Sequence, residues 1–199
     1  GEIMLPFTST EEYLATNNVI SKSEYLSSPS VYIGLAKGMM NYFGNATISV
    51  DGVEQEYNAG LGGNSFNCAL GIHTYVVTPA NESEAILRGK VEVTSEQPNA
   101  SLWLNIVAGY TAEIYTIDQL SEPIEGASVT FGETTVLTDA TGLASFKRYP
   151  AGNYTVSASK DNYSGITSEV IELNTADVLK LLTLNQLTFT VTFNVTSGT

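Results

Sequence analysis

Apolar and polar residues alternate along several segments of this chain, most regularly near the C-terminus. The apolar members of that C-terminal segment are Leu187, Phe189, Val191, Phe193 and Val195, with threonine or asparagine between them. Residues two positions apart lie on the same face of a β-strand, so this period predicts a strand that buries one face. Residues 46–50, 127–131 and 154–158 alternate in the same way. The pattern therefore favours a β protein.

Turn-forming residues separate these segments. Asp51-Gly52 predicts a tight hairpin between a strand at 45–50 and a return strand at 53–57. Further turns are expected at 138–142 and 150–152. The other segments that the pattern assigns to strands are 68–77, 85–93, 101–108 and 111–117. Over 29–44 the pattern does not distinguish helix from strand.

The chain of 199 residues is long enough for two small β domains, each with its own core. The alternation is interrupted at 121–123, which marks the expected domain boundary. We therefore expect an all-β fold of two antiparallel β-sandwich domains, Ig-like or jelly-roll-like, at 9–120 and 121–199. Residues 1–8 are expected to be extended, as an edge or added strand, because Pro6 cannot donate a ladder hydrogen bond.

Three motifs in the second half resemble a known family. They are Pro123-Ile124-Glu125-Gly126-Ala127-Ser128-Val129, Thr138-Asp139-Ala140-Thr141-Gly142 and Pro150-Ala151-Gly152-Asn153-Tyr154-Thr155-Val156. Through these motifs, residues 122–173 resemble the carboxypeptidase-regulatory-like (transthyretin-like) β-sandwich family. The resemblance implies a non-catalytic accessory or adhesive module on an extracellular protein. One departure is Asn162-Tyr163, which stands where the family usually has Gly-Tyr.

The charge balance excludes two classes of partner. The chain has 21 acidic and 8 basic residues, for a formal net charge of −13. An acidic surface repels phosphate backbones and anionic lipid headgroups, so we expect neither nucleic-acid nor membrane-surface binding. The sequence has no apolar run long enough to span a bilayer. The sequence starts with Gly1 rather than Met, which fits removal of a signal peptide and cleavage of a tag equally well. Together with the sequons described below, it leads us to expect an extracellular or cell-surface protein after signal-peptide removal.

The sequence shows no catalytic constellation, so we expect a protein without catalytic residues, cofactor or metal ion. Cys68 and His73 are the only cysteine and histidine. On one continuous strand they would lie on opposite faces and about 16 Å apart, unless a bulge or turn intervenes. The glycine-rich residues 60–64 read as a turn, because neither the lysine nor the strand–turn–helix context of a phosphate-binding loop accompanies them.

Asn-X-Ser/Thr sequons indicate a glycosylated surface. They begin at Asn45, Asn81, Asn99, Asn153, Asn162 and Asn194. Three of these asparagines stand on the polar side of alternating segments, and two stand in expected turns. The pattern favours a secreted β protein with covalent glycans.

Both ends of the chain are candidates for a donated strand. The first hypothesis is a structural subunit of an extracellular filament, in which a terminal strand of one copy completes a sheet of the next. The preferred donor carries Ile3, Leu5 and Phe7. The alternative donor is the alternating segment 187–195, which more naturally completes its own domain because it continues directly from 178–182. In design only, the whole resembles archaeal surface filaments built by donor-strand complementation, the threads and bundling pili.

The second hypothesis is a non-polymerising module of a larger cell-surface protein, either adhesive or ligand-binding. Tyrosines at 25, 32, 42 and 110 would then stack on sugars. Electron microscopy distinguishes the two hypotheses, because only the first requires filaments of identical subunits.

Overall fold

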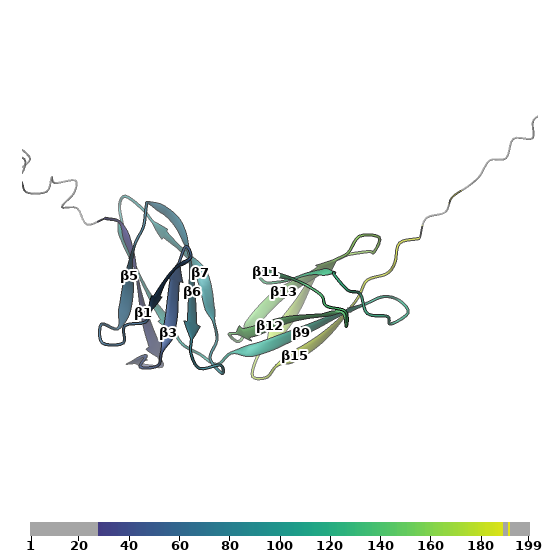
Figure 1. The fold of residues 1–199 in the computed structure, drawn as a ribbon, viewed down its shortest axis with the longest axis horizontal. Helices are drawn as coiled ribbons and strands as arrows, with labels where there is room; N and C mark the ends of the chain where they lie inside the picture. Colours follow the sequence, from purple (N-terminus) through teal and green to yellow (C-terminus); the bar gives the residue numbers. More distant parts are fainter. Residues whose placement is uncertain (1–27, 189–190, 192–199) are drawn as a thin grey trace, which may run out of the picture. The chain divides into compact units, whose positions relative to one another are not determined.

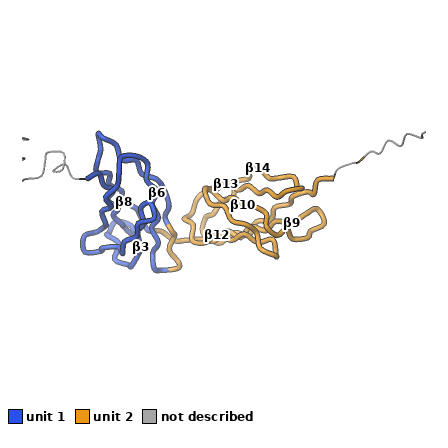
Figure 2. The backbone as a smooth tube through the Cα atoms, turned by 45° about the horizontal axis from the view of Figure 1, so that its top comes forward, with its two compact units in different colours: residues 1–81, 87–106 blue, residues 82–86, 107–199 orange. Residues whose placement is uncertain are grey.

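In a computed structural model, which describes residues 28–188 and residue 191, all regular structure in the described range is β-strand. These strands form two units (Figure 1). The described part of unit 1 comprises residues 28–81 and 87–106, and that of unit 2 comprises 82–86 and 107–188. Figure 2 colours the two units separately. The all-β fold of two sandwiches agrees with the sequence prediction.

Two sheets form unit 1. The first sheet contains β1 (Ser30–Lys37), β2 (Met40–Asn41), β5 (Gly63–Asn67) and β8 (Asn99–Asn105). In it, β1 pairs with β2 and β5 on one side and with β8 on the other. The second sheet has the order β4-β3-β6-β7, formed by β4 (Val53–Glu56), β3 (Ala46–Val50), β6 (Gly71–Pro79) and β7 (Leu87–Val93).

The core of unit 1 follows from the alternation along its strands. In β1, Val31, Ile33 and Leu35 are fully buried, and in β3 the buried residues Ala46, Ile48 and Val50 alternate with half-buried ones. Residues from both sheets belong to one apolar cluster, so the two sheets pack face to face.

The hairpin predicted at 45–57 is confirmed. Val50 pairs with Val53 across the turn, and Asp51 and Gly52 have positive φ angles of 49° and 82°. This conformation is the one that a two-residue hairpin needs, and Asp-Gly adopts it readily. The undecided segment 29–44 contains β1 and the short β2.

Two sheets also form unit 2. One has the order β11-β10-β13-β14, formed by β11 (Thr134–Leu137), β10 (Ser128–Phe131), β13 (Gly152–Ser159) and β14 (Ile166–Leu173). The other has the order β12-β9-β15, formed by β12 (Leu143–Tyr149), β9 (Tyr110–Ile117) and β15 (Val178–Thr183).

An aromatic cluster forms part of the core of unit 2. The ring centroid of Phe131, which is fully buried, lies 4.6 Å from that of Tyr154, 5.1 Å from that of Tyr149 and 5.2 Å from that of Phe146. Aromatic pairs at these separations stabilise a core beyond the area they bury. The alternation at 127–131 and 154–158 therefore places its apolar members in this core.

The structure differs from the sequence prediction in strand direction and in the placement of the boundary. Two pairs of strands, β1 with β8 and β9 with β15, are parallel rather than antiparallel. Long connections permit this, because the chain travels through several other strands between the two partners. The expected boundary at 120/121 would assign β9 to the first domain. In the structure, β9 is instead the central strand of a sheet in unit 2.

Candidate functional site

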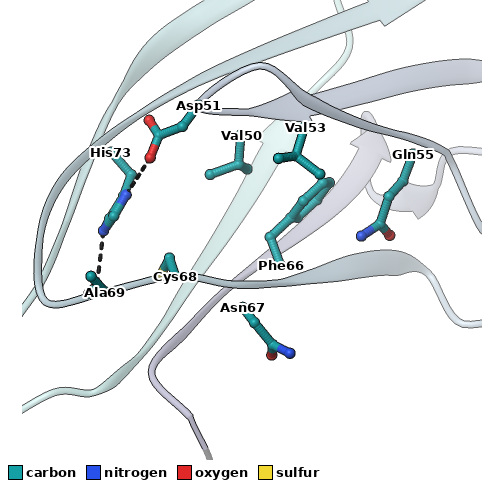
Figure 3. A pocket seen from close by; sticks show the side chains of 9 residues that line it. All are labelled: Val50, Asp51, Val53, Gln55, Phe66, Asn67, Cys68, Ala69 and His73. Carbon is teal, nitrogen blue, oxygen red and sulfur yellow. Dashed lines mark hydrogen bonds and ion pairs between the residues drawn. The ribbon is translucent and has the colours of Figure 1, made fainter.

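Unit 1 has an open groove on the side where β4 and β5 are the sheet edges. The groove has a volume of about 470 Å³. Its apolar lining comes from Val50, Val53, Phe66 and Cys68, as Figure 3 shows. Val53, on the edge strand β4, is 62% exposed, although its side chain is fully apolar. An apolar lining on a sheet edge is the feature that distinguishes this groove from an ordinary surface hollow.

One end of the groove is closed by side-chain hydrogen bonds between the two edges. Asn64 Nδ2 of β5 donates to Gln55 Oε1 at 3.0 Å and to the Glu56 carbonyl at 2.9 Å, both on β4. In return, Gln55 Nε2 donates to the Ser65 carbonyl at 3.2 Å. The polar side chains thus hold β4 and β5 together without a backbone ladder.

The other end of the groove is held by an ion pair. His73 Nδ1 lies 2.5 Å from Asp51 Oδ2, and His73 Nε2 lies 2.9 Å from the Ala69 carbonyl, as the dashed lines in Figure 3 mark. Both partners are acceptors, and a neutral imidazole carries only one N–H, so only the protonated ring donates to both. The His73 ring of β6 therefore joins Asp51 in the β3–β4 turn to Ala69 in the loop before β6.

This geometry shifts both pKa values. The hydrogen bond to Asp51 raises the pKa of His73, with the Ala69 carbonyl contributing and burial opposing the shift. The pKa of Asp51 is lowered by the hydrogen bond from His73 and by the backbone hydrogen bond from Thr74. Both pKa shifts have the same cause, because each group has partners that stabilise its charged form. The pair is thus a structural clamp.

Cys68 also lines the groove. It does not lie in a strand, so the strand expected at 68–77 is wrong at its start. Strand β5 ends at Asn67 and β6 begins at Gly71, so residues 68–70 form a connection between two strands. The estimate that Cys68 and His73 lie about 16 Å apart along one strand therefore does not apply. Catalysis by the two residues still has no support. Burial raises the pKa of the Cys68 thiol, with a smaller contribution from Asp51, and both His73 nitrogens already contact other groups.

Neither a metal centre nor a membrane-spanning helix is found among the described residues. That part of the chain contains no group of three side chains placed to hold a metal ion, and no helix that is apolar and long enough to cross a bilayer. Asp139, a candidate calcium ligand by its chemistry, instead accepts hydrogen bonds from Thr141 and Leu143 within its own turn. These bonds lower the pKa of Asp139.

The predicted glycosylation asparagines stand at exposed positions wherever the structure describes them. These are Asn45, Asn81, Asn99, Asn153 and Asn162. Asn99 lies in β8 and Asn153 in β13, whereas Asn162 is in a turn with a φ of 67°. Asn194 lies outside the described residues. Exposure makes each of the five accessible to a modifying enzyme, and their occupancy stays a prediction.

The two candidate donor segments fall mostly outside the described residues. Ile3, Leu5 and Phe7 lie there, as do Phe189, Phe193 and Val195. Leu187 and Val191 are described, and neither is in a strand; they are 46% and 68% exposed. The backbone N–H of Leu187 donates to the Asn162 carbonyl at 2.7 Å, so the start of this segment is attached to unit 2.

Trp103 on β8 is 59% exposed and is not among the residues predicted from the sequence to be functional. Its ring centroid lies 6.0 Å from that of Tyr32 on β1, with 58° between the ring planes. Tyr32 was a candidate for sugar stacking. The sequence does indicate the position of Trp103, because it stands between the apolar Leu102 and Leu104 in β8. Neighbouring residues of a strand point to opposite faces, so Trp103 points away from the core.

Comparison with solved structures gives distant likenesses. The TIE protein of Bacillus anthracis aligns over 78% of this chain and 33% of its own, at 20% identity and a TM-score of 0.35. A streptococcal ancillary pilin aligns over 79% of this chain and 62% of its own, at 11% identity and a TM-score of 0.40. The minor pilin GBS52 of Streptococcus agalactiae aligns over 84% of this chain and all of its own, at 10% identity and a TM-score of 0.40. This chain thus spans about a third of the TIE protein and under two thirds of the ancillary pilin.

Sequence comparison assigns part of unit 2 to a family. No curated protein matches the chain as a whole. Residues 115–187 match the family model described as Carboxypeptidase regulatory-like domain. The matched range contains β10 to β15 and the end of β9, which are the strands of the two sheets of unit 2. The resemblance inferred from the motifs at 122–173 is thereby confirmed: this part of the chain is similar to the carboxypeptidase regulatory-like domain.

Proposed function

We propose that this chain is a structural subunit of an extracellular filament, which polymerises head-to-tail by donor-strand complementation. The N-terminal segment with Ile3, Leu5 and Phe7 of one copy occupies the groove between β4 and β5 of the next. The observation that carries the proposal is this groove, an apolar hollow at two sheet edges of unit 1. The role requires no catalysis, cofactor or metal ion.

The edges provide backbone pairing for an added strand. Strand β4 pairs with β3 on one side, and β5 pairs with β1 on one side, so each has a second side that faces the groove. An extended segment laid there would hydrogen-bond to an edge and direct alternate side chains into the hollow. Val53 and Phe66 are the apolar surfaces that those side chains would cover.

The energy of such a joint is sufficient for a polymer. Burial of three large apolar side chains contributes about 5–9 kcal/mol before the entropy costs of association. Because the donor and the groove are different surfaces, each contact leaves a second donor and a second groove unused, and the assembly extends as a fibre unless it closes into a ring.

The N-terminal segment is preferred over the alternative donor at 187–195. The latter begins as part of unit 2, where Gln186 forms a bridge with Tyr163 and Leu187 donates to Asn162. A segment anchored in this way has less reach toward a neighbouring subunit. The proposal places the protein at the cell surface with covalent glycans on the exposed sequon asparagines.

Electron microscopy of matched variants tests the proposal. The full chain is expected to form filaments, and the chain without residues 1–8 is expected to remain monomeric. Val53→Asp introduces a charge into the groove and is expected to prevent assembly. Val170→Asp is the matched control, because Val170 lies on the edge strand β14 of unit 2 and is 65% exposed, against 62% for Val53. Filaments that persist without residues 1–8, or that Val170→Asp abolishes while Val53→Asp does not, would contradict the proposal.

One observation favours the second hypothesis, a ligand-binding or adhesive module. The exposed Trp103 and the half-buried Tyr32 form a pair on the outer face of a sheet rather than in the groove. A filament subunit could also carry a binding face. Because the groove and the aromatic pair consist of different residues, variants can test the two functions separately.

A further inference from the structure

The only tryptophan of the chain is held with one face against the backbone and is 59% exposed. Trp103 on β8 stands directly opposite Gly34 on the parallel strand β1. A Cβ atom at Gly34 would lie 2.7, 2.8 and 2.9 Å from three atoms of the indole. Three nearly equal distances mean that the ring lies with its face over the glycine. The opposite face of the ring is therefore directed away from the sheet.

Tyr32 adds a second ring beside the indole. The end of its ring covers Gly63 on β5, where a Cβ atom would lie 2.7 Å from Tyr32 Cζ, and its hydroxyl donates to the Leu61 carbonyl at 3.1 Å. The hydrogen bond and the covered glycine fix the ring in place. The planes of Tyr32 and Trp103 are inclined by 58°. Together the rings form an aromatic corner that is built before any ligand arrives.

The surface around this corner is polar, and no charged residue occupies an outward-facing position of its described strands. The outward-facing positions of β8 are Asn99, Ser101, Trp103 and Asn105, and the neighbouring outward positions on β1, β2 and β5 are glycine, alanine, serine and asparagine, together with Tyr32. Asn41 lies near the rings, with its Nδ2 3.8 Å from a Cβ position at Gly62. The chain as a whole has a net charge of −13, so this uncharged face differs from the average composition of the chain.

We propose that this outer face of the first sheet binds a neutral oligosaccharide carried by another molecule, with one sugar ring stacked on Trp103. An aromatic face packs against the C–H groups of a pyranose, and amides and hydroxyls around it donate to and accept from sugar hydroxyls. The absence of charged residues at the outward-facing positions of these strands suits a neutral ligand. Nucleic acid, whose bases also stack on aromatic rings, is disfavoured because the face supplies no cation for a phosphate.

The site is distinct from the groove, so it goes beyond the proposed filament function. The groove lies between the edges β4 and β5, whereas the aromatic corner lies on the outer face of the first sheet, on β1 and β8. The sequon at Asn99 is on the same face, four residues or about 13 Å along β8 from Trp103. Unglycosylated protein is therefore required for the test, so that a glycan of the chain itself does not occupy the site.

Because Trp103 is the single tryptophan, its fluorescence reports on the site directly. The unglycosylated full chain is titrated with cellohexaose, chitohexaose, mannohexaose, xylohexaose and laminarihexaose, and with oligogalacturonate as an anionic counterpart. We expect a saturable change in emission with at least one neutral hexasaccharide and none with oligogalacturonate. Absence of any saturable change at millimolar concentrations of the neutral sugars would overturn the proposal.

Calorimetry with variants shows whether the aromatic corner causes the binding. Trp103→Ala and Tyr32→Ala are expected to weaken it by about tenfold or more, the equivalent of one aromatic contact, and Trp103→Phe by less. Ile72→Ala is the matched control, because Ile72 is a large side chain, 69% exposed, on the other sheet of unit 1. Unfolding curves establish that each variant is folded. If Trp103→Ala does not fold, Trp103→Phe replaces it in the test, because phenylalanine still covers Gly34 with an aromatic ring.

Two results would contradict the assignment. Binding by Trp103→Ala equal to that of the unsubstituted chain would show that the indole only covers Gly34. Dissociation of a self-associated chain by Trp103→Ala, seen by sedimentation, would show that the face contacts a second copy instead of a sugar.

Discussion

The two units close the sides of their sandwiches to different degrees. In unit 2, Lys180 of β15 and Glu169 of β14 form an ion pair at 2.6 Å across one side. On the other side, the Tyr149 hydroxyl of β12 donates to Thr134 Oγ1 of β11 at 2.6 Å. In unit 1, the described side chains of β4 and β5 bridge the edges around Asn64, and beyond this point the apolar groove opens. The comparison shows that side chains bridge both sides of the sandwich in unit 2, whereas a sheet edge of unit 1 leaves apolar side chains uncovered.

The largest expected effect tests the assigned aromatic core of unit 2. Phe131→Ala removes the fully buried ring that contacts three other aromatic rings, and we expect the free energy of unfolding to fall by about 3–5 kcal/mol. Denaturant unfolding followed by circular dichroism measures it. Leu137→Ala, at a side chain that is 65% exposed on β11, is the control and is expected to change stability by less than about 0.5 kcal/mol. Equal effects of the two variants would contradict the assigned core.

A smaller effect is expected at the closed end of the groove. Asn64→Ala removes the hydrogen bonds to Gln55 and Glu56 and the acceptor for the Asn58 N–H. We expect a loss of about 1–3 kcal/mol in the unfolding free energy, because partly buried polar partners lose their bonds. Asn67→Ala, on the same strand and exposed, is the control. If Asn67→Ala were as damaging, the bridge would not be what holds β4 and β5 together.

The pH dependence of stability tests the His73–Asp51 clamp. The pKa of His73 is raised in the folded state, so its contribution is complete below its ordinary pKa of about 6.5 and is lost as pH rises through the higher folded value. The pKa of Asp51 is lowered, so its contribution is present above about 3.9 and is lost as pH falls through the lower folded value. Stability of unit 1 from this pair should thus be greatest between these limits.

The sole histidine gives a single resonance set for an NMR titration. We expect an elevated pKa for His73 in the unsubstituted chain and a shift back toward 6.5 or below in Asp51→Asn, since burial then remains as the opposing influence. Glu54→Gln is the control, because Glu54 is an exposed carboxylate on the adjacent strand β4. An unchanged His73 pKa in Asp51→Asn would show that the carboxylate does not hold the ring.

The smallest effect is expected at the side of unit 2 that an ion pair bridges. Glu169→Gln removes the charge that pairs with Lys180, and both side chains are more than a third exposed. Solvent screens such pairs, so we expect a loss of no more than about 1 kcal/mol, which decreases further in high salt. Unfolding at low and high ionic strength measures it. A loss of several kcal/mol would mean that the ion pair, rather than the aromatic core, holds this side closed.

Local signals in the sequence predicted the local parts of this fold. The hairpin at 46–56 follows from Asp51-Gly52, whose positive φ angles few other residue pairs adopt readily. The turn at 68–70 was missed because Ala69 and Leu70 are apolar and resemble a strand. Strand β11 was missed because Thr134 to Leu137 places two threonines before two apolar residues and does not alternate.

Contacts between distant segments could not be predicted, and these form both candidate sites. The parallel pairing of β1 with β8 places Gly34 under Trp103, although 69 positions separate them. Likewise, His73 and Asp51 meet because β3 and β6 pair, and the alternation in either strand does not specify its partner. The sequence predicted that Trp103 and Val53 lie in strands, but only the tertiary arrangement shows what lies beside them.

The most direct test of the central claim is a cross-link between two copies. One copy carries Leu5→Cys and the other Val53→Cys, each with Cys68→Ser so that no native thiol competes. After assembly of the mixture and mild oxidation, the account predicts a disulfide-linked dimer of the two chains, and none when Val170→Cys replaces Val53→Cys. Filaments that form without the Leu5–Val53 cross-link, or that cross-link equally well through position 170, would contradict the account.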